Sequence, residues 1–195
     1  KGQMIGIIGS SGSGKSTLVD IILGVLTPKS GSIFLDQKQL KSNNIPCWQK
    51  KIGYVQQSIF LLDDSIRRNI AFGIEDEKID DQKIRRCLIN AQLDDFVANL
   101  DNGLDTIVGE RGVRLSGGQI QRIGICRALY NEPEVLLLDE ATSSLDQETE
   151  TEFMKSVNKM VGQLTIIIIA HRLSTVQKCD FIYRLEKGKL ISKGL

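Results

Sequence analysis

Short, uninterrupted apolar runs alternate along this chain with longer segments in which apolar residues recur every three or four positions. Met4–Ile8 and 135–138 are such runs, and the run at 165–169 is β-branched throughout. Runs of this length are typical of strands buried on both faces of a parallel sheet. We therefore predict strands at these positions and at 31–35 and 52–55.

The longer segments have the spacing of amphipathic helices. We predict helices at about 15–23 and 117–130, and the pattern stays helical over about 65–99. A glycine-containing loop is predicted at about 101–115. The residues that mark helix faces are Ile84, Leu88 and Ala91 in one segment and Phe153, Val157, Met160 and Leu164 in another.

The end of the chain has the pattern of a β-hairpin. Its strands are predicted at 181–185 and 189–192, with Lys187 and Gly188 in the turn. Strands thus alternate with helices near both ends of the sequence, whereas the middle is helical. This order predicts an α/β fold with a mostly parallel sheet and an inserted helical subdomain.

Composition narrows the classes of partner. The 195 residues are 41% hydrophobic, which suits one ordinary globular domain. The 25 basic and 24 acidic residues nearly cancel, which argues against a nucleic-acid partner. The longest apolar run, 164–170, is too short to cross a bilayer. The cysteines are widely spaced without a C-x-x-C pair, so we predict free thiols.

One glycine-rich segment carries the strongest chemical signal. It fits G-x-x-x-x-G-K-[ST] at every fixed position and lies between a predicted strand and a predicted helix. Its glycines can turn backbone N–H groups inward, and the helix adds the positive end of its dipole. Lys15 can reach the β- and γ-phosphates of a nucleotide, and the Ser16 hydroxyl can ligate Mg²⁺. The predicted phosphate loop comprises Gly9, Ser10, Ser11, Gly12, Ser13, Gly14, Lys15, Ser16 and Thr17.

Two carboxylates, Asp139 and Glu140, follow directly on the apolar run at 135–138. In parallel α/β sheets, ligands bind at this carboxyl edge. Asp139 suits a water-bridged partner of Mg²⁺, and Glu140 is placed to polarise an attacking water as general base. The alternative, a pair of solvated acids that ends a strand, is disfavoured by the phosphate loop.

A second helix start suits an anion. Ser116 and Gln119 form the sequence pattern of a capping box. The capping box does not account for Gly117 and Gly118, because each glycine disfavours a helix by about 1 kcal/mol relative to Ala. Glycines here would leave backbone N–H groups open to a phosphate. We therefore expect this helix end to meet a nucleotide held by another copy in a two-fold dimer.

The order of motifs resembles the nucleotide-binding domain of ABC transporters over about 2–188. The motifs are the phosphate loop (P-loop), Gln57, Leu-Ser-Gly-Gly-Gln at 115–119, Leu-Asp-Glu at 138–140, Ser-Ser-Leu-Asp at 143–146 and Ala-His-Arg at 170–172. The resemblance implies a P-loop NTPase core that binds ATP and Mg²⁺ and hydrolyses ATP. It also implies one domain, 1–195, with an ATP-binding core at 1–57 and 132–195 and a helical subdomain at 58–131.

The resemblance assigns roles to individual residues. It implies that Gln57 contacts Mg²⁺ and the attacking water, that His171 contacts the γ-phosphate, and that Asp146 lies at the dimer seam. Catalysis is thereby assigned to Lys15, Gln57, Glu140 and His171, and Mg²⁺ binding to Ser16, Gln57 and Asp139. The implied contacts with the ATP of the second, head-to-tail domain come from Ser116, Gly117, Gly118 and Gln119.

A further segment favours the exporter class. Val-Gly-Glu-Arg-Gly at 108–112 resembles a loop typical of exporters. The resemblance implies that Glu110 and Arg111, together with the Gln57 loop, contact a transmembrane domain on the cytoplasmic side of a membrane. The stretch 111–130 also resembles exporters of lipids and lipid-linked sugars.

Some features depart from the family pattern. Ser144 and Cys126 stand where Ala is commoner. The chain begins directly before a strand, so we expect a piece of a longer protein that is truncated at its N-terminus. The upstream strands and the aromatic residue that stacks on adenine are absent from the sequence in hand. The fragment alone is therefore expected to hydrolyse ATP weakly.

The sequence leaves other functions to be weighed against an exporter motor. One is the ATPase of an importer, and another is a nucleotide-gated dimerisation module with little turnover. A third is an ABC ATPase that acts on DNA or ribosomes. The interval from Gln57 to Leu115 is too short for the long coiled coil of the DNA-repair relatives, and no tandem domain or basic linker is visible.

Overall fold

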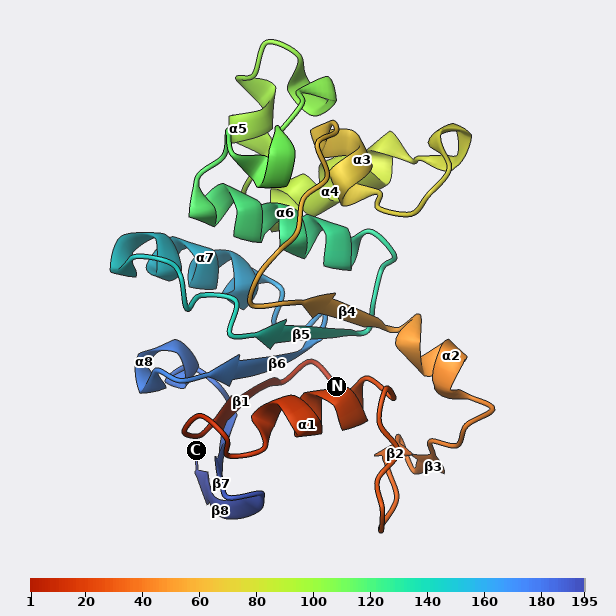
Figure 1. Ribbon diagram of the computed structural model, residues 1–195, viewed down its shortest axis with the longest axis vertical. Coiled ribbons are helices and arrows are strands. Elements are labelled where there is room, and N and C mark those ends of the chain that lie inside the picture. The colour runs from red at the N-terminus through yellow and green to blue at the C-terminus, as the bar shows by residue number, and fades with distance from the viewer. Residues whose placement is uncertain (195) are drawn as a thin grey trace.

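The computed structural model describes residues 1–194, and its centre is a six-stranded sheet in the order β4-β5-β6-β1-β7-β8 (Figure 1). All neighbouring strands are parallel except β7 and β8. The predicted mostly parallel α/β sheet is confirmed. The strands are β1 (Met4–Ile8), β4 (Ile52–Val55), β5 (Val135–Asp139), β6 (Thr165–Ala170), β7 (Phe181–Glu186) and β8 (Lys189–Gly194).

Helices flank the sheet and fill the middle of the chain. They are α1 (Lys15–Ile22), α2 (Ile45–Gln49), α3 (Ile66–Ile70), α4 (Asp81–Asn90), α5 (Asp94–Ala98), α6 (Gly117–Leu129), α7 (Gln147–Lys159) and α8 (Leu173–Val176). Helices α3 to α6 lie between β4 and β5 in sequence and above the sheet in Figure 1. Among residues 1–194, no helix has the length and apolar character to cross a membrane.

The apolar runs are buried because both faces of the sheet are covered. On one face, Leu137 of β5 packs in a cluster with Val19 of α1. On the other face, Leu136 and Leu138 belong to the main core with Phe153 of α7 and residues of α6. Successive side chains of a strand point to opposite faces, so a strand covered on both sides must be apolar at every position.

The parallel register brings three loops to one edge. Ile8 at the end of β1 pairs with Ala170 at the end of β6, and Asp139 at the end of β5 pairs with Ile169. The next residues along the chain, Gly9, Glu140 and His171, therefore lie at the same carboxyl edge of the sheet, the edge at which the sequence predicted Glu140.

Residues 1–194 contain two β-hairpins, of which the sequence predicted only one. The turn between β7 and β8 uses Lys187 and Gly188, both with positive φ, of 46° and 74°, and this prediction is confirmed. The strand predicted at 31–35 is mostly wrong. Only β2 (Phe34–Leu35) forms there, paired with β3 (Lys38–Gln39) in a separate small sheet.

The helical segments predicted at 65–99 and around Phe153 also need correction. The first is broken into α3, a 3₁₀ turn at Asp76–Lys78, α4 and α5. It breaks at Gly73 and Gln92, which take positive φ, and at Asp80, whose carboxylate caps α4. The loop at 101–115 contains two further 3₁₀ turns, Gly103–Asp105 and Glu110–Gly112. Helix α7 ends at Lys159, so Leu164 is not on its face.

Candidate active site

The loop after β1 closes around one ammonium group. Gly14 caps α1 with a φ of 102°, a conformation that a side chain would strain. Lys15, only 6% exposed, donates hydrogen bonds to the carbonyl oxygens of Gly9 at 2.9 Å and Ser10 at 3.2 Å. The chain thus folds between strand and helix as a phosphate loop requires, with its lysine pointing inward.

The loop opens onto a cavity of about 540 Å³. The cavity lies at the carboxyl edge of the sheet, where parallel α/β folds bind their ligands. It brings together the four residues predicted to be catalytic, although they come from four separate segments of the chain. The residues that line it are Ser11, Gly12, Gly14, Lys15, Ser16, Thr17, Gln57, Glu140 and His171.

Two of these residues, Lys15 and His171, converge on the carboxylate of a third, Glu140. Glu140 Oε1 lies 2.5 Å from His171 Nε2 and 3.9 Å from Lys15 Nζ. The Glu140 side chain is 16% exposed, whereas the His171 side chain is 44% exposed. The backbone N–H of Glu140 donates to Ile169 O at 2.9 Å, which ties this residue to the end of β6. A carboxylate fixed in this way can accept a proton from a water in the cavity.

Asp139 points to a different partner. Its Oδ2 accepts a hydrogen bond of 3.1 Å from the hydroxyl of Tyr54 in β4. Burial raises the pKa of Asp139, although the Tyr54 hydrogen bond acts in the opposite direction. Burial and the neighbouring Asp139 also raise the pKa of Tyr54. The sequence did not predict that Tyr54 contacts the site, because a tyrosine within a strand is typical of an ordinary half-buried position.

The donors present fit the expected Mg²⁺. This hard cation takes oxygen ligands and keeps several waters. Ser16 and Gln57 line the cavity and carry a hydroxyl and an amide oxygen, whereas the carboxylate of Asp139, at the end of β5, is not part of the lining and could reach the ion only through water. In the described part of the chain, no group of three or more His, Cys, Asp or Glu side chains could hold a metal by itself.

The Gln57 segment is held from two directions. Its side-chain amide donates to the Ser143 hydroxyl at 3.3 Å, and its carbonyl oxygen accepts from the Gln121 side chain at 3.2 Å. Gln121 is 4% exposed and belongs to α6. A helix that begins with Ser116 as its cap is thus connected directly to a residue of the cavity.

At the start of α6, the structure confirms the predicted capping box but gives a different explanation for one of the two glycines. The capping box is present: Ser116 N donates to Gln119 Oε1 at 2.8 Å, and Gln119 N donates to Ser116 Oγ at 3.3 Å. Gly118 has an internal reason to be glycine, because a Cβ there would lie 2.5 Å from Thr149 Cγ2. At Gly117 a Cβ would meet no atom closer than 3.7 Å, and the residue is exposed. Only Gly117 therefore supports an external ligand.

The four residues at 116–119 do not line the cavity that contains Lys15. Asp146 also lies outside this set and caps α7 by accepting from the N–H groups of Glu148 at 3.1 Å and Thr149 at 3.0 Å. Hydrogen bonds from Thr149 lower the pKa of Asp146. Apart from Gly117, these predicted binding residues thus have structural roles within the chain, and the nucleotide contacts of all of them stay a prediction.

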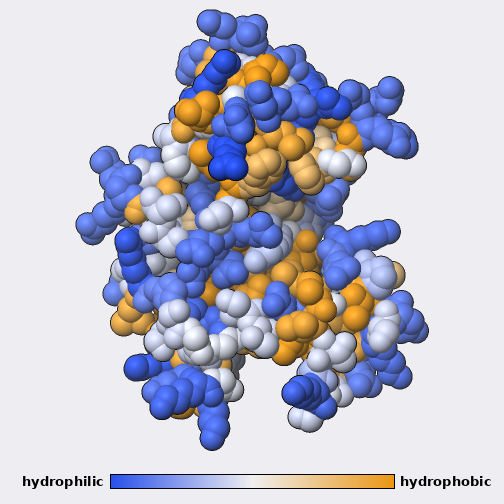
Figure 2. Space-filling view, viewed as in Figure 1, coloured by the Kyte–Doolittle hydropathy of each residue, from blue (hydrophilic) through white to orange (hydrophobic). Residues whose placement is uncertain are grey.

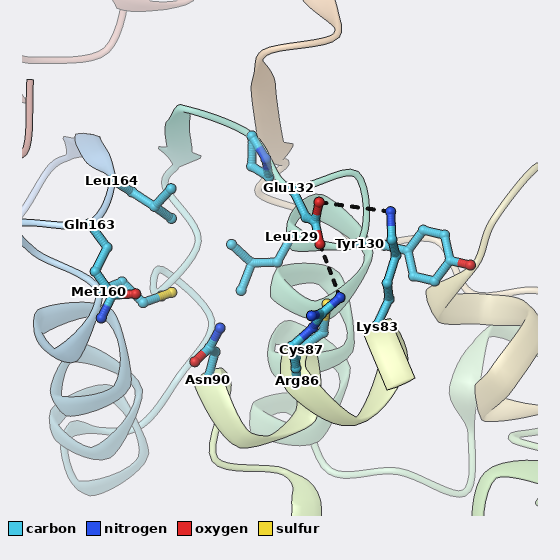
Figure 3. Close-up of a pocket in the computed structure, with 11 residues that line it drawn as sticks. Lys83, Arg86, Cys87, Asn90, Leu129, Tyr130, Glu132, Met160, Gln163 and Leu164 are labelled. Atoms are coloured by element: carbon cyan, nitrogen blue, oxygen red, sulfur yellow. Dashed lines mark hydrogen bonds and ion pairs between the residues drawn. The ribbon is translucent and has the colours of Figure 1, made fainter. Parts of the chain in front are cut away.

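A second cavity, of about 250 Å³, lies at the opposite edge (Figure 3). Pro133 and Leu164, which precede β5 and β6, are among its lining residues. Figure 3 shows Glu132 facing Lys83 and Arg86 of α4, with ion pairs at 3.8 Å and 3.1 Å. These contacts fasten the helical part to the sheet. The cavity lies at the amino ends of the strands and holds none of the predicted site residues.

Comparison with known proteins decides the family. A family model described as ABC transporter matches residues 1–143, well over half of the chain. The chain belongs to the ABC transporter family. An ATP-dependent lipid A-core flippase of Ralstonia nicotianae is 41% identical over 194 residues, 99% of this chain and 33% of that protein. ABC transporter B family member 17 of Arabidopsis thaliana is 42% identical over 194 residues, 100% of this chain and 16% of that protein.

A solved structure gives the same answer for this ABC domain. A bacterial Atm1-family ABC exporter with ATP bound superposes with a TM-score of 0.87 and 37% identity, over 99% of this chain and 34% of that chain. The ABC domain thus spans about a third or less of the length of these proteins. The predicted exporter-type nucleotide-binding domain is confirmed, and the importer alternative is disfavoured.

The exporter-like loop of the ABC domain has a defined shape. Glu110–Gly112 forms a 3₁₀ turn in which Arg111 has a φ of 54°. The side chains of Glu110 and Arg111 are both exposed, whereas Gly112 is buried against Leu61. The loop therefore presents two opposite charges to the outside while its backbone stays anchored in the helical part.

Proposed function

We propose that this domain binds ATP with Mg²⁺ and hydrolyses it as the motor of an ABC exporter. The observation that carries the proposal is the convergence of Lys15 and His171 on Glu140 in the phosphate-loop cavity. Lys15 turns from the carbonyls of the loop to the β- and γ-phosphates. Glu140 takes the proton of the attacking water, and His171 holds the γ-phosphate in line with that water.

Bound Mg²⁺ supplies charge neutralisation to the phosphate oxygens. Ser16 and Gln57 are the cavity residues that would hold it, and Asp139 would do so through water. Tyr54 keeps the Asp139 carboxylate in one orientation by its hydrogen bond of 3.1 Å. The remaining loop residues, through backbone N–H groups at the start of α1, surround the phosphates.

The second half of the site comes from another domain. We propose a head-to-tail dimer with an identical or homologous nucleotide-binding domain, in which Ser116, Gly117, Gly118 and Gln119 close on the other copy's ATP and Asp146 lies at the seam. The exposed, sterically open Gly117 supports this arrangement. The domain boundaries that go with it are a core at 1–57 and 132–195 and a helical subdomain at 58–131.

We further propose that a transmembrane domain docks on the helical subdomain, which places the domain on the cytoplasmic side of a membrane. Glu110 and Arg111 would meet it together with the Gln57 loop. Phe60 and Phe72, near that loop and α3, are 58% and 51% exposed. Figure 2 shows apolar side chains interrupting the polar surface over the helical part. Such a patch is typical of an interaction surface.

A lipid or lipid-linked sugar is our proposal for the cargo. It rests on the similarity to lipid A-core flippases, at 41% identity. The similarity to the Arabidopsis protein is equally high, at 42%. The motor domain alone therefore does not select one cargo, and flipping of a labelled lipid by the full-length protein in vesicles is the test.

Phosphate release by the full-length protein tests the enzymatic function. With ATP and Mg²⁺, multiple turnovers are expected, and chelation of Mg²⁺ by EDTA should reduce the rate by at least about 100-fold, because uncompensated phosphate charge opposes the reaction. ATP binding without phosphate release would instead support the nucleotide-gated dimerisation module.

A further inference from the structure

One buried carboxylate hydrogen-bonds to the two loops that carry the proposed catalytic residues. Glu150, in the first turn of α7, is 8% exposed. Its Oε1 accepts hydrogen bonds from the hydroxyls of Thr142 at 2.9 Å and Thr175 at 2.6 Å. Its Oε2 accepts from Arg172 Nη1 at 3.0 Å. A charge at such burial requires its partners to stay in place, since each lost bond leaves it without compensation.

Two of these partners flank the proposed catalytic residues. Thr142 is two residues after Glu140, and Arg172 directly follows His171. The two catalytic side chains meet at 2.5 Å, although they follow different strands of the sheet. Glu150 thus bonds to both loops at once, from an element that belongs to neither.

Backbone hydrogen bonds within the loop after β5 couple the position of Thr142 to that of Glu140. Ser143 N donates to Glu140 O at 3.0 Å, and Leu145 N donates to Thr142 O at 3.1 Å. These bonds close two successive tight turns between β5 and α7. A displacement of Thr142 would therefore displace Glu140 as well. On the other loop, Arg172 and His171 share a peptide unit, so the Arg172 side chain restrains the backbone of His171.

The ionised form of Glu150 is favoured in the fold. Burial raises its pKa, but the hydrogen bonds from Thr175, Thr142 and Arg172 outweigh burial, and the pKa lies below its ordinary value. The amino end of α7 adds favourable dipole potential for an acidic residue in the first turn. The three partners therefore face a full negative charge, which makes their hydrogen bonds short and directional.

We propose that Glu150 is a positioning residue that sets the contact between Glu140 and His171. It touches neither of them and acts through Thr142 and Arg172. The inference rests on the roles proposed above for Glu140 and His171. It implies that loss of the Glu150 contacts slows the chemical step and leaves ATP binding unchanged, because the phosphate loop is not among its partners.

Thr142 offers a sharp test in the full-length protein. Thr142→Val keeps the shape and removes the hydroxyl donor, whereas Thr142→Ser keeps the donor and removes a methyl group. Positioning predicts a fall in kcat of about 10-fold for the valine variant, with KM for ATP within about threefold and the serine variant within about twofold of the parent. A packing role predicts the reverse order of the two variants.

Glu150→Gln tests the carboxylate itself, because the amide offers one acceptor oxygen instead of two and its NH2 group must face either the Arg172 guanidinium or the hydroxyls of Thr142 and Thr175. A fall in kcat of about 10- to 100-fold is expected with KM for ATP within about threefold. Glu152→Gln is the matched control on the same helix, since its side chain is 57% exposed, and it should retain the parent rate. If Glu150→Gln does not accumulate as folded protein, the Thr142 pair decides alone.

The outcomes separate this inference from the proposed function. Parent-like kcat for Thr142→Val, or equal losses for valine and serine, overturns the positioning role. Glu140→Gln measured in parallel reports on the proposed catalytic roles: if that variant turns over at the parent rate, the proposed function of Glu140 fails first. If it is inactive while Thr142→Val and Glu150→Gln are fully active, only the inference about Glu150 fails.

Discussion

Replacing Glu140 by Gln is expected to reduce kcat for ATP hydrolysis by at least about 100-fold while Kd for ATP changes by less than about threefold. The amide keeps the size of the side chain and can still bond to His171, but it cannot accept the proton of the attacking water. Loss of a negative charge 3.9 Å from Lys15 does not oppose an anionic ligand. Steady-state phosphate release and calorimetric ATP titration of the full-length protein measure the two quantities.

Glu134→Gln is the matched control. Glu134 directly precedes β5, whereas Glu140 directly follows it, and the Glu134 side chain is 44% exposed and pairs with Lys51. This variant should hydrolyse ATP at the parent rate. A parent-like rate for Glu140→Gln would contradict the assignment of the general base and would require another acceptor for the proton.

Replacing Lys15 by Ala is expected to raise Kd for ATP by at least about 100-fold and to abolish measurable hydrolysis. Of the described residues that line the cavity, Lys15 alone carries an ammonium group. The two hydrogen bonds that we propose it donates to phosphates are charge-assisted, and such bonds are worth about 1.5–3 kcal/mol each. Two such bonds correspond to at least about 100-fold in Kd, since about 1.4 kcal/mol is tenfold.

The buried environment of Lys15 requires a stability control for this variant. Its removal leaves the carbonyl oxygens of Gly9 and Ser10 without the ammonium donor, so Tm is measured beside binding. Lys51→Ala, a change at an exposed lysine paired with Glu134, should leave Kd for ATP unchanged. If the folded Lys15→Ala protein bound ATP as tightly as the parent, the phosphates would not contact Lys15 and this prediction would be wrong.

The buried strands could be predicted because each signal is local. The runs at β1, β5 and β6 are apolar apart from Thr165 and the terminal Asp139, as double-sided burial requires, and the parallel register then fixes which loops meet. The convergence of Lys15, Glu140 and His171 follows from that register together with recognisable motifs. These parts of the fold and site needed no knowledge of long-range side-chain contacts.

Other features depend on contacts that a linear pattern does not contain. The β2–β3 hairpin turns through Asp36 and Gln37 with φ of 46° and 69°, and neither residue is the glycine that usually marks such a turn. The two glycines at the start of α6 differ in their surroundings. Gly118 is required by Thr149, a neighbour 31 positions away along the chain (149 − 118), whereas Gly117 is sterically open.

The roles of the polar residues that support the site could not be predicted from the sequence either. Tyr54 and Gln121 have ordinary spacing within a strand and a helix, yet they hydrogen-bond to Asp139 and to the carbonyl oxygen of Gln57. Glu150 reads as one acid among several at the start of α7. Its burial and its bonds to the two loops that carry the proposed catalytic residues arise only when three separate segments pack together.

The central claim is that each ATP is held between the phosphate loop of one copy and the α6 start of another. Crosslinking tests it most directly, using full-length copies with Glu140→Gln and the exposed Cys47 and every other accessible cysteine replaced by Ser. One copy carries Ser11→Cys and the other Gly117→Cys, with a short thiol crosslinker. The claim predicts a crosslinked pair whose yield rises strongly with ATP and Mg²⁺. Copies that bind ATP but give no ATP-dependent crosslink would contradict it.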